Sequence, residues 1–126
     1  MIDDEEEFSG LIKFHLEGVG TFEIETVFDG KSGLAAAKRI KPDLILLDIL
    51  MPGMDGFEVL KKLKSDSETV KIPVIMFSAV SDVKAQVRAA QLFDEEYITK
   101  PVDIKILKEK IEKALSRRYG KHEHTA

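Results

Sequence analysis

Residues 44–48 read LILLD, a run of four apolar residues that ends directly in an aspartate. A short, continuous apolar run of this kind is typical of a strand that is buried on both faces of a parallel sheet. Residues 74–78 repeat the arrangement as VIMFS, and a shorter strand is predicted over 96–99. Each of these three predicted strands ends in, or is directly followed by, a polar side chain: Asp48, Ser78 and Lys100.

Segments with helical periodicity separate the predicted strands. Residues 22–27 alternate between apolar and polar side chains, so we expect a further strand there, toward an edge of the sheet. Asp55 is predicted to be a helix N-cap, with Glu58 completing a capping box. Strands that alternate with helices predict an α/β fold, in which functional groups lie beyond the carboxyl ends of parallel strands. Apolar residues three or four positions apart predict helices over about 5–17, 30–40, 56–65, 82–92 and 103–117.

The bulk composition restricts the classes of function. The length of 126 residues favours one domain, which we place at 1–118, followed by a tail at 119–126 without a clear pattern. The net charge of −4 argues against direct binding of nucleic acid, because such proteins are normally basic. The chain has no cysteine, which excludes thiol catalysis. No apolar stretch reaches the roughly 18–20 residues that span a bilayer, and residues 3–7 are acidic, unlike a secretory signal. We therefore expect a cytoplasmic protein without a membrane partner.

Several short stretches, in this order and at this spacing, resemble the receiver domain family of two-component response regulators. They are Asp3-Asp4, LLDILMPGMDG at 46–56, FSA at 77–79 and YITKP at 97–101. The resemblance runs from Asp3 to about Leu115. It implies a flavodoxin-like, doubly wound fold with helices on both faces of a parallel five-stranded sheet in the order 2-1-3-4-5.

The residues that carry the resemblance suit the chemistry of phosphoryl transfer. Three carboxylates in one crevice, from Asp3, Asp4 and Asp48, raise one another's pKa unless a cation joins them. Hard oxygen ligands favour Mg²⁺, and the resemblance implies that Mg²⁺ or Mn²⁺ is held by these three residues and the backbone carbonyl of Leu50. It also implies that Asp48 is the phosphoacceptor. A carboxylate can attack a phosphoryl group, and the Lys100 ammonium would neutralise charge there.

The family resemblance also implies a conformational switch. The Ser78 hydroxyl would hydrogen-bond a phosphoryl oxygen, and Tyr97 would turn inward when that hydroxyl moves. The changed surface would comprise about residues 82–117, which would bind a downstream protein partner or an output domain. A sensor histidine kinase or a phosphotransfer protein would supply the phosphoryl group. The domain would thus be a phosphoacceptor that promotes its own phosphorylation and dephosphorylation, rather than an enzyme with a separate substrate.

One departure from the family concerns the first strand. Only Met1 and Ile2 precede Asp3, where the family has a longer apolar strand in the middle of the sheet. The first strand is therefore expected to be truncated, and a missing central strand would leave both neighbouring strands without hydrogen-bond partners. Three explanations stay open: a truncated start, a very short strand, or another segment or chain in the gap. A strand exchanged between protomers would give a homodimer.

Other functions are weighed against the phosphoacceptor. The missing strand motivates a receiver-like interaction module that is no longer phosphorylated. A hydrolase of the haloacid-dehalogenase type needs a second acid two residues after the nucleophile, and Leu50 stands there. A flavin-binding domain is disfavoured because no phosphate loop rich in Ser, Thr and Gly follows the first strand. Intact mass after treatment with an acyl phosphate would separate the first alternative from the phosphoacceptor.

Overall fold

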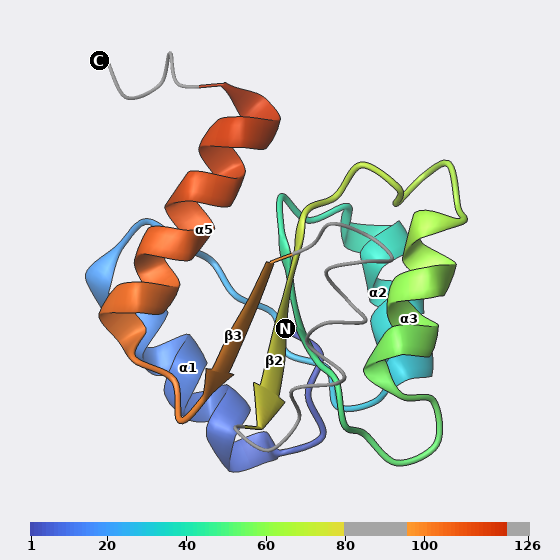
Figure 1. The fold of residues 1–126 in the computed structure, drawn as a ribbon, viewed down its shortest axis with the longest axis horizontal. Coiled ribbons are helices and arrows are strands. Elements are labelled where there is room, and N and C mark those ends of the chain that lie inside the picture. Colours follow the sequence, from blue (N-terminus) through green and yellow to red (C-terminus); the bar gives the residue numbers. More distant parts are fainter. Residues whose placement is uncertain (80–95, 121–126) are drawn as a thin grey trace.

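The computed structural model describes residues 1–79 and 96–120. The described elements are β1 (Ile45–Asp48), β2 (Val74–Ala79) and β3 (Glu96–Lys100), with four helices around them (Figure 1). The predicted helix over 82–92 lies outside the described residues, as does most of the predicted tail at 119–126. The helices are α1 (Glu6–Val19), α2 (Gly30–Ile40), α3 (Gly56–Lys64) and α5 (Ile104–Tyr119).

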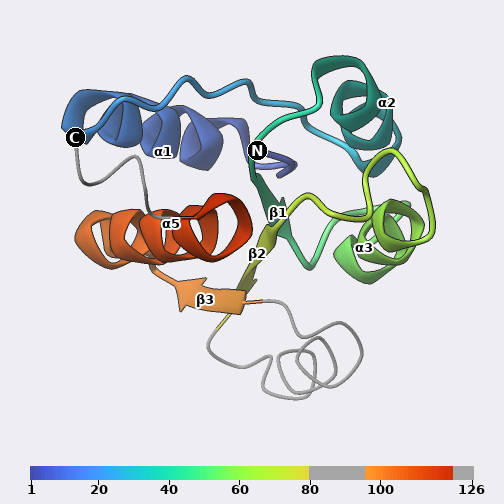
Figure 2. The same cartoon turned by 90° about the horizontal axis from the view of Figure 1, so that it is seen from above.

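The three strands form a parallel sheet in the order β1-β2-β3. Leu47 of β1 is in register with Met76 of β2, which is in register with Tyr97 of β3. Helices cover both faces, with α2 and α3 on one side and α1 and α5 on the other (Figure 2). Side chains of β1 and β2 alternate between these two layers: Leu47 and Met76 pack in one apolar cluster, and Leu46, Ile75 and Phe77 in the other. The expected α/β fold is therefore present.

The other edge of β1 carries a much shorter pairing. Ile2 forms isolated parallel bridges with Leu47 and with Val27. The Ile2 N–H donates to the Leu46 carbonyl at 2.7 Å, and the Ile2 carbonyl accepts from the Asp48 N–H at 2.9 Å. On the far side, the Val27 N–H donates to the Met1 carbonyl at 2.9 Å. Among the described residues, the pairing at this edge of β1 is therefore limited to isolated bridges.

The strand predicted over 22–27 is not formed, apart from the bridge at Val27. An extended segment needs a neighbour to pair its backbone groups, and Met1 and Ile2 reach only one end of it. Side chains of α1 take over part of this role, because the Glu17 carboxylate accepts from the Ile24 N–H at 2.8 Å and Lys13 donates to the Ile24 carbonyl. The described part of the chain therefore contains three strands, whereas five were expected in the whole domain.

A groove of about 990 Å³ lies beside Met1 and Ile2. It is lined by residues of α1, α2, β1 and α5 and by residues 21–27. Met1 and Ile2 lie at the groove, and the Met1 amino group donates to the Glu25 carbonyl at 2.8 Å. The apolar residues of the lining include Leu16, Ile24, Ala36, Leu46 and Ile111.

The predicted capping box at the start of α3 is confirmed. The Asp55 carboxylate accepts from the Glu58 N–H at 2.9 Å, and the Glu58 carboxylate accepts from the Asp55 N–H at 3.4 Å. α5 ends later than predicted, at Tyr119, whose hydroxyl donates to the Asp43 carbonyl at 2.9 Å.

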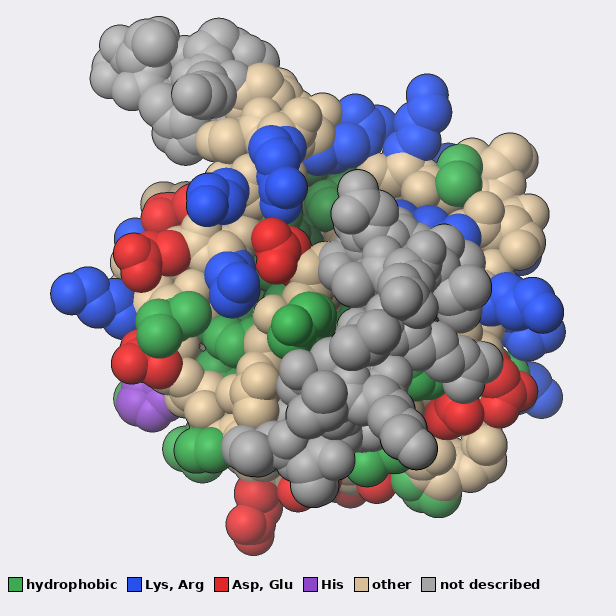
Figure 3. Space-filling model, in the orientation of Figure 1, with side chains coloured by type: hydrophobic (Ala, Val, Ile, Leu, Met, Phe, Trp, Pro, Cys, Tyr) green, Lys and Arg blue, Asp and Glu red, His purple; other side chains and the backbone are tan. Residues whose placement is uncertain are grey.

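None of the described helices is both long and apolar enough to cross a membrane. Basic and acidic side chains are interspersed over the described part of the face in Figure 3.

Candidate functional site

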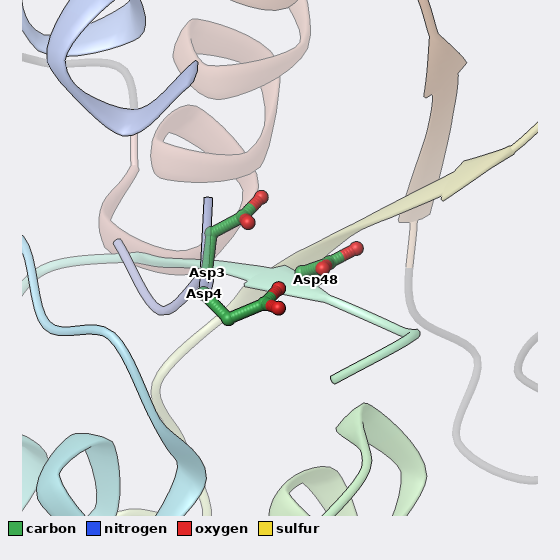
Figure 4. Close-up of side chains that lie close together, drawn as sticks. All are labelled: Asp3, Asp4 and Asp48. Atoms are coloured by element: carbon green, nitrogen blue, oxygen red, sulfur yellow. The ribbon is translucent and has the colours of Figure 1, made fainter. Parts of the chain in front are cut away.

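Three acidic side chains meet at the carboxyl end of β1. Asp48 ends β1, and the bridge between Ile2 and Leu47 brings Asp3 and Asp4 beside it. One carboxylate oxygen from each aspartate lies within 4.8 Å of the other two. Figure 4 shows the three side chains reaching into the same space from the segment before α1 and from β1. The predicted acidic cluster is therefore assembled.

Burial makes two of these carboxylates unfavourable as anions. The exposed fraction is 0% for Asp3 and 5% for Asp48. Burial and the negative charges of Asp3 and Asp4 raise the pKa of Asp48 to about 7, although the nearby Lys100 ammonium opposes the shift. Burial also raises the pKa of Asp3, against the hydrogen bond from the Glu5 N–H and the charge of Lys100. Such a cluster needs further positive charge to be fully ionised at neutral pH.

The donor set of this cluster fits a hard divalent cation. Carboxylate oxygens are the ligands that Mg²⁺ and Mn²⁺ prefer, and Mg²⁺ commonly binds through few carboxylates while it keeps several waters. Asp3 is held in place because its Oδ1 accepts from the Glu5 N–H at 2.9 Å. Hydrogen bonds of this kind orient a ligand and support metal affinity. The Asp3, Asp4 and Asp48 carboxylates could therefore hold the cation.

Lys100 places a positive charge beside the acidic cluster. Its Nζ lies 3.5 Å from the Asp48 Oδ1, 3.3 Å from the Asp3 Oδ2 and 2.8 Å from the Glu5 Oε1. It also lies 4.4 Å from the centre of the Phe8 ring. Burial disfavours the charged form, but Glu5, Asp48 and Asp3 together raise the pKa of Lys100 above its usual 10.5. The ammonium is therefore charged at neutral pH and lies close to the Asp48 carboxylate.

The backbone after Asp48 is fixed by close contact with the start of α3. The Gly56 N–H donates to the Ile49 carbonyl at 2.8 Å. A Cβ at Gly56 would lie only 2.3 Å from the Asp48 carbonyl oxygen and 2.6 Å from the Ile49 Cα. Only glycine fits there, so α3 begins directly against the strand end and closes the loop that follows Asp48.

The remaining predicted residues are placed less completely. Ser78 lies in β2, where it is paired with Thr99 of β3, and its side chain lies outside the described residues. Tyr97 is in β3 with 36% of its surface exposed. Leu50 lies two residues beyond Asp48 in the loop before α3, with 62% of its surface exposed. The structure thus brings together Asp3, Asp4, Asp48 and Lys100.

Sequence reasoning missed Glu5 and Phe8 as neighbours of Lys100. Glu5 directly follows Asp3 and Asp4 in the sequence, and this adjacency could have indicated that it belongs to the site. Its contact with Lys100, however, joins residues 95 positions apart and depends on where α1 begins. The apolar spacing around Phe8 predicted only a helix face, although its ring also packs edge-on against Phe77 with the centroids 5.6 Å apart.

Comparisons with known proteins agree with this architecture. The family described as response regulator receiver domain matches residues 1–112. The DNA-binding dual master transcriptional regulator RpaA of Synechocystis sp. is 35% identical over 118 residues, which make up 94% of this chain and 48% of that protein. The phosphate regulon transcriptional regulatory protein PhoB of Rhizobium meliloti is 32% identical over 118 residues, 94% of this chain and 51% of that protein. The chain spans about half the length of these curated relatives.

Solved structures give the same result. The receiver domain of NtrX from Brucella abortus is 32% identical, with a TM-score of 0.83 and coverage of 91% of this chain and 95% of that one. The Francisella response regulator 1452 receiver domain is 28% identical, with a TM-score of 0.82 and coverage of 92% and 93%. The family match and the NtrX relative cover nearly the whole domain. The chain therefore belongs to the response regulator receiver domain family of two-component signalling.

Proposed function

We propose that Asp48 is the phosphoacceptor of this receiver domain and that its phosphorylation depends on a divalent cation. The observation that carries the proposal is a buried carboxylate with an ammonium 3.5 Å away and two further carboxylates within 4.8 Å. The Asp48 pKa, raised to about 7, supports a requirement for added positive charge before this oxygen can act as a nucleophile.

The transfer itself is a displacement at phosphorus. An Asp48 carboxylate oxygen forms a bond to the phosphorus, while the bond from phosphorus to the donor breaks and the donor keeps its electron pair. A phosphohistidine of a sensor kinase or of a phosphotransfer protein would be the donor. The Lys100 ammonium would accept a share of the phosphoryl charge, because this reaction depends mainly on positioning and neutralisation. Hydrolysis of the aspartyl phosphate at the same site would return the domain to its starting state.

Asp3, Asp4 and Asp48 would hold Mg²⁺ or Mn²⁺, together with the Leu50 carbonyl. The bound ion would supply the positive charge that the phosphoryl oxygens and the acidic cluster share. The Asp3 carboxylate, oriented by the Glu5 N–H, would keep its position as the ion arrives. This assignment draws support from the donor type and the closeness of the three carboxylates.

Phosphorylation would be transmitted through Ser78 and Tyr97. A phosphoryl group adds about −1.5 to −2 charge and three acceptor oxygens, and the Ser78 hydroxyl would donate to one of them while Tyr97 turns inward. The surface that changes would include β3 and α5 and would bind a downstream partner or an output domain. We also propose the strand order 2-1-3-4-5, with Val27 in the place of the edge strand 2 and Ile2 in the place of strand 1, between Val27 and β1.

Intact mass spectrometry tests the proposal directly. The protein would be incubated with Mg²⁺ and a small acyl phosphate, beside a receiver domain that is known to react. We expect the mass of one phosphoryl group on the wild type and on Asp43→Asn, an exposed aspartate away from the site. Asp48→Asn, or a chelator, would abolish the gain. An unmodified wild type, or equal modification of Asp48→Asn, would contradict the proposal, and the former would favour an interaction module that is not phosphorylated.

A further inference from the structure

Among the described residues, Glu5 is the acid closest to the Lys100 ammonium. Its Oε1 lies 2.8 Å from the Lys100 Nζ, whereas the nearest oxygens of Asp3 and Asp48 lie at 3.3 and 3.5 Å. The Glu5 side chain is 59% exposed, while that of Lys100 is 21% exposed. The lysine is therefore shared between a buried pair of carboxylates and an exposed one at the rim of the site.

The position of Glu5 in the chain is not explained by helix capping. Glu5 is the N-cap of α1, yet its side chain makes no capping hydrogen bond. Short side chains such as Ser, Thr, Asp and Asn are the usual N-caps, because they can reach the first free N–H groups. The Glu5 backbone is fixed to the site instead, since its N–H donates to the Asp3 carboxylate and its carbonyl accepts from the Ser9 N–H.

Phe8 supports the same position of the ammonium from the first turn of α1. The Lys100 Nζ lies 4.4 Å from the centre of its ring, a separation at which a cation is attracted to an aromatic face. The Phe8 ring is itself held edge-on against the buried Phe77. The start of α1 thus contributes both an anion and an aromatic ring to hold the lysine on its side of the site.

We propose that Glu5 is a positioning residue that retains Lys100 at the start of α1 and competes for it with the phosphoryl group. The inference rests on the proposed function of Asp48. Since Lys100 must share its charge with the incoming phosphoryl oxygens, an acid that holds it at 2.8 Å slows the transfer. The same contact keeps the ammonium from pairing more closely with Asp3 and Asp48, which leaves their oxygens available to the cation.

The substitution Glu5→Gln separates these two effects, and the chain offers matched controls. Glu6→Gln and Glu7→Gln remove the same charge from the first turn of α1, where neither residue is among the described contacts of Lys100. We expect Glu5→Gln to be phosphorylated about two- to fivefold faster than the controls at saturating Mg²⁺, the range for loss of an exposed ion pair. We also expect Glu5→Gln to bind Mg²⁺ more weakly than either control.

A double substitution asks whether Glu5 acts through Lys100. In a Lys100→Met background, Glu5→Gln should change the Mg²⁺ dissociation constant no more than Glu6→Gln does. Isothermal titration calorimetry gives this constant, and the time course of intact mass gives the rate. Both are measured on the full chain, and circular dichroism of each variant checks that it is folded.

The outcomes distinguish this inference from the proposed function. A wild type that is phosphorylated, with Glu5→Gln equal to the controls in both rate and Mg²⁺ affinity, would overturn the role of Glu5 alone. A wild type that is not phosphorylated would overturn the function of Asp48. The Mg²⁺ dissociation constants of the variants would then test whether Glu5 positions Lys100. Weaker binding by Glu5→Gln than by Glu6→Gln, lost in the Lys100→Met background, would support it, and equal constants would overturn it.

Discussion

The two sides of β1 differ in how they are held together. On the ladder side, formed by β1, β2 and β3, residues pair continuously along the strands. On the bridge side, formed by Met1–Ile2 and residues 22–27, only isolated bridges occur and a groove of about 990 Å³ adjoins them. The acidic cluster joins the two, because Asp48 belongs to the ladder side and Asp3 follows directly from the bridge side.

This difference shows that the geometry of the site depends on a very short segment, Met1–Ile2. Ile2 is buried with 3% of its surface exposed, and its two bridges fix where Asp3 and Asp4 begin. The ladder side supplies Asp48 and Lys100 from strands whose pairing with β2 does not involve Met1 or Ile2. We therefore expect substitutions on the two sides to differ in their effect on stability and on cation binding.

The largest difference is expected between apolar truncations on the two sides. Phe77→Ala removes a fully buried ring of the ladder side and should lower the free energy of unfolding by about 3–5 kcal/mol. Ile24→Ala removes a partly buried side chain at the groove and should lower it by only about 1 kcal/mol, because the site is already open. Urea unfolding followed by circular dichroism measures both. Equal losses would show that the bridge side is as well packed as the ladder side.

The second effect is electrostatic and concerns the junction of the two sides. The pKa of Asp48 is raised from its usual 3.8 to about 7 in the folded protein, so without a divalent cation the folded state binds more protons than the unfolded state between these values. Its contribution to stability is therefore lost as the pH rises from about 4 to 7. Asp48→Asn should raise the free energy of unfolding at pH 7 by about 1–3 kcal/mol.

The control for this pH dependence is Asp43→Asn, which changes an exposed aspartate outside the cluster. It should keep the wild-type fall of stability between pH 4 and 7, whereas Asp48→Asn should flatten it. Urea unfolding at several pH values in the presence of a chelator gives the slopes. A wild-type slope that persists in Asp48→Asn would contradict the assignment of the shifted group.

The third prediction compares two helical glycines. A Cβ at Gly33 of α2 would lie 2.5 Å from the Cδ1 of Ile2, whereas a Cβ at Gly10 of α1 would meet no atom within 4 Å. Gly33→Ala should therefore destabilise the protein by about 1–2 kcal/mol and weaken Mg²⁺ binding by displacing Ile2. Gly10→Ala should stabilise it by about 0.5–1 kcal/mol with unchanged Mg²⁺ binding. Thermal unfolding and calorimetry measure these effects, and an unchanged Mg²⁺ constant in Gly33→Ala would remove the link to Asp3.

The smallest effect concerns the side chain that replaces a strand partner. The Glu17 carboxylate accepts from the Ile24 N–H at 2.8 Å, so Glu17→Ala should speed amide exchange at Ile24. Glu17 also pairs with Lys13 in i,i+4 spacing, and Glu112 pairs with Lys108 in the same way on α5. Glu112→Ala should therefore cost about 0.3–0.5 kcal/mol and leave amide exchange at Ile24 unchanged. Hydrogen exchange distinguishes the two. Unchanged amide exchange at Ile24 in Glu17→Ala would show that the hydrogen bond to Glu17 does not protect this N–H from exchange.

The ladder side could be predicted from the sequence because its apolar runs and strand-end polar residues carry the information locally. The capping box at Asp55 is equally local. The pattern at 22–27 reports which side chains face the core, but it does not report whether a neighbouring strand is there to pair with. Contacts of the site that join distant residues, such as Glu5 with Lys100, depend on the packing of α1 against β3 and have no local signal.

Hydrogen exchange with and without Mg²⁺ tests most directly the claim that a cation at the acidic cluster joins the two sides. Without the ion, the amides of Asp3 and Val27 should exchange faster than those of the ladder side, such as Ile75. Saturation with Mg²⁺ should slow exchange at Asp3 and Val27 by a larger factor than at Ile75, and this change should vanish in Asp48→Asn. Equal slowing on both sides, or none at Asp3 and Val27, would contradict the claim.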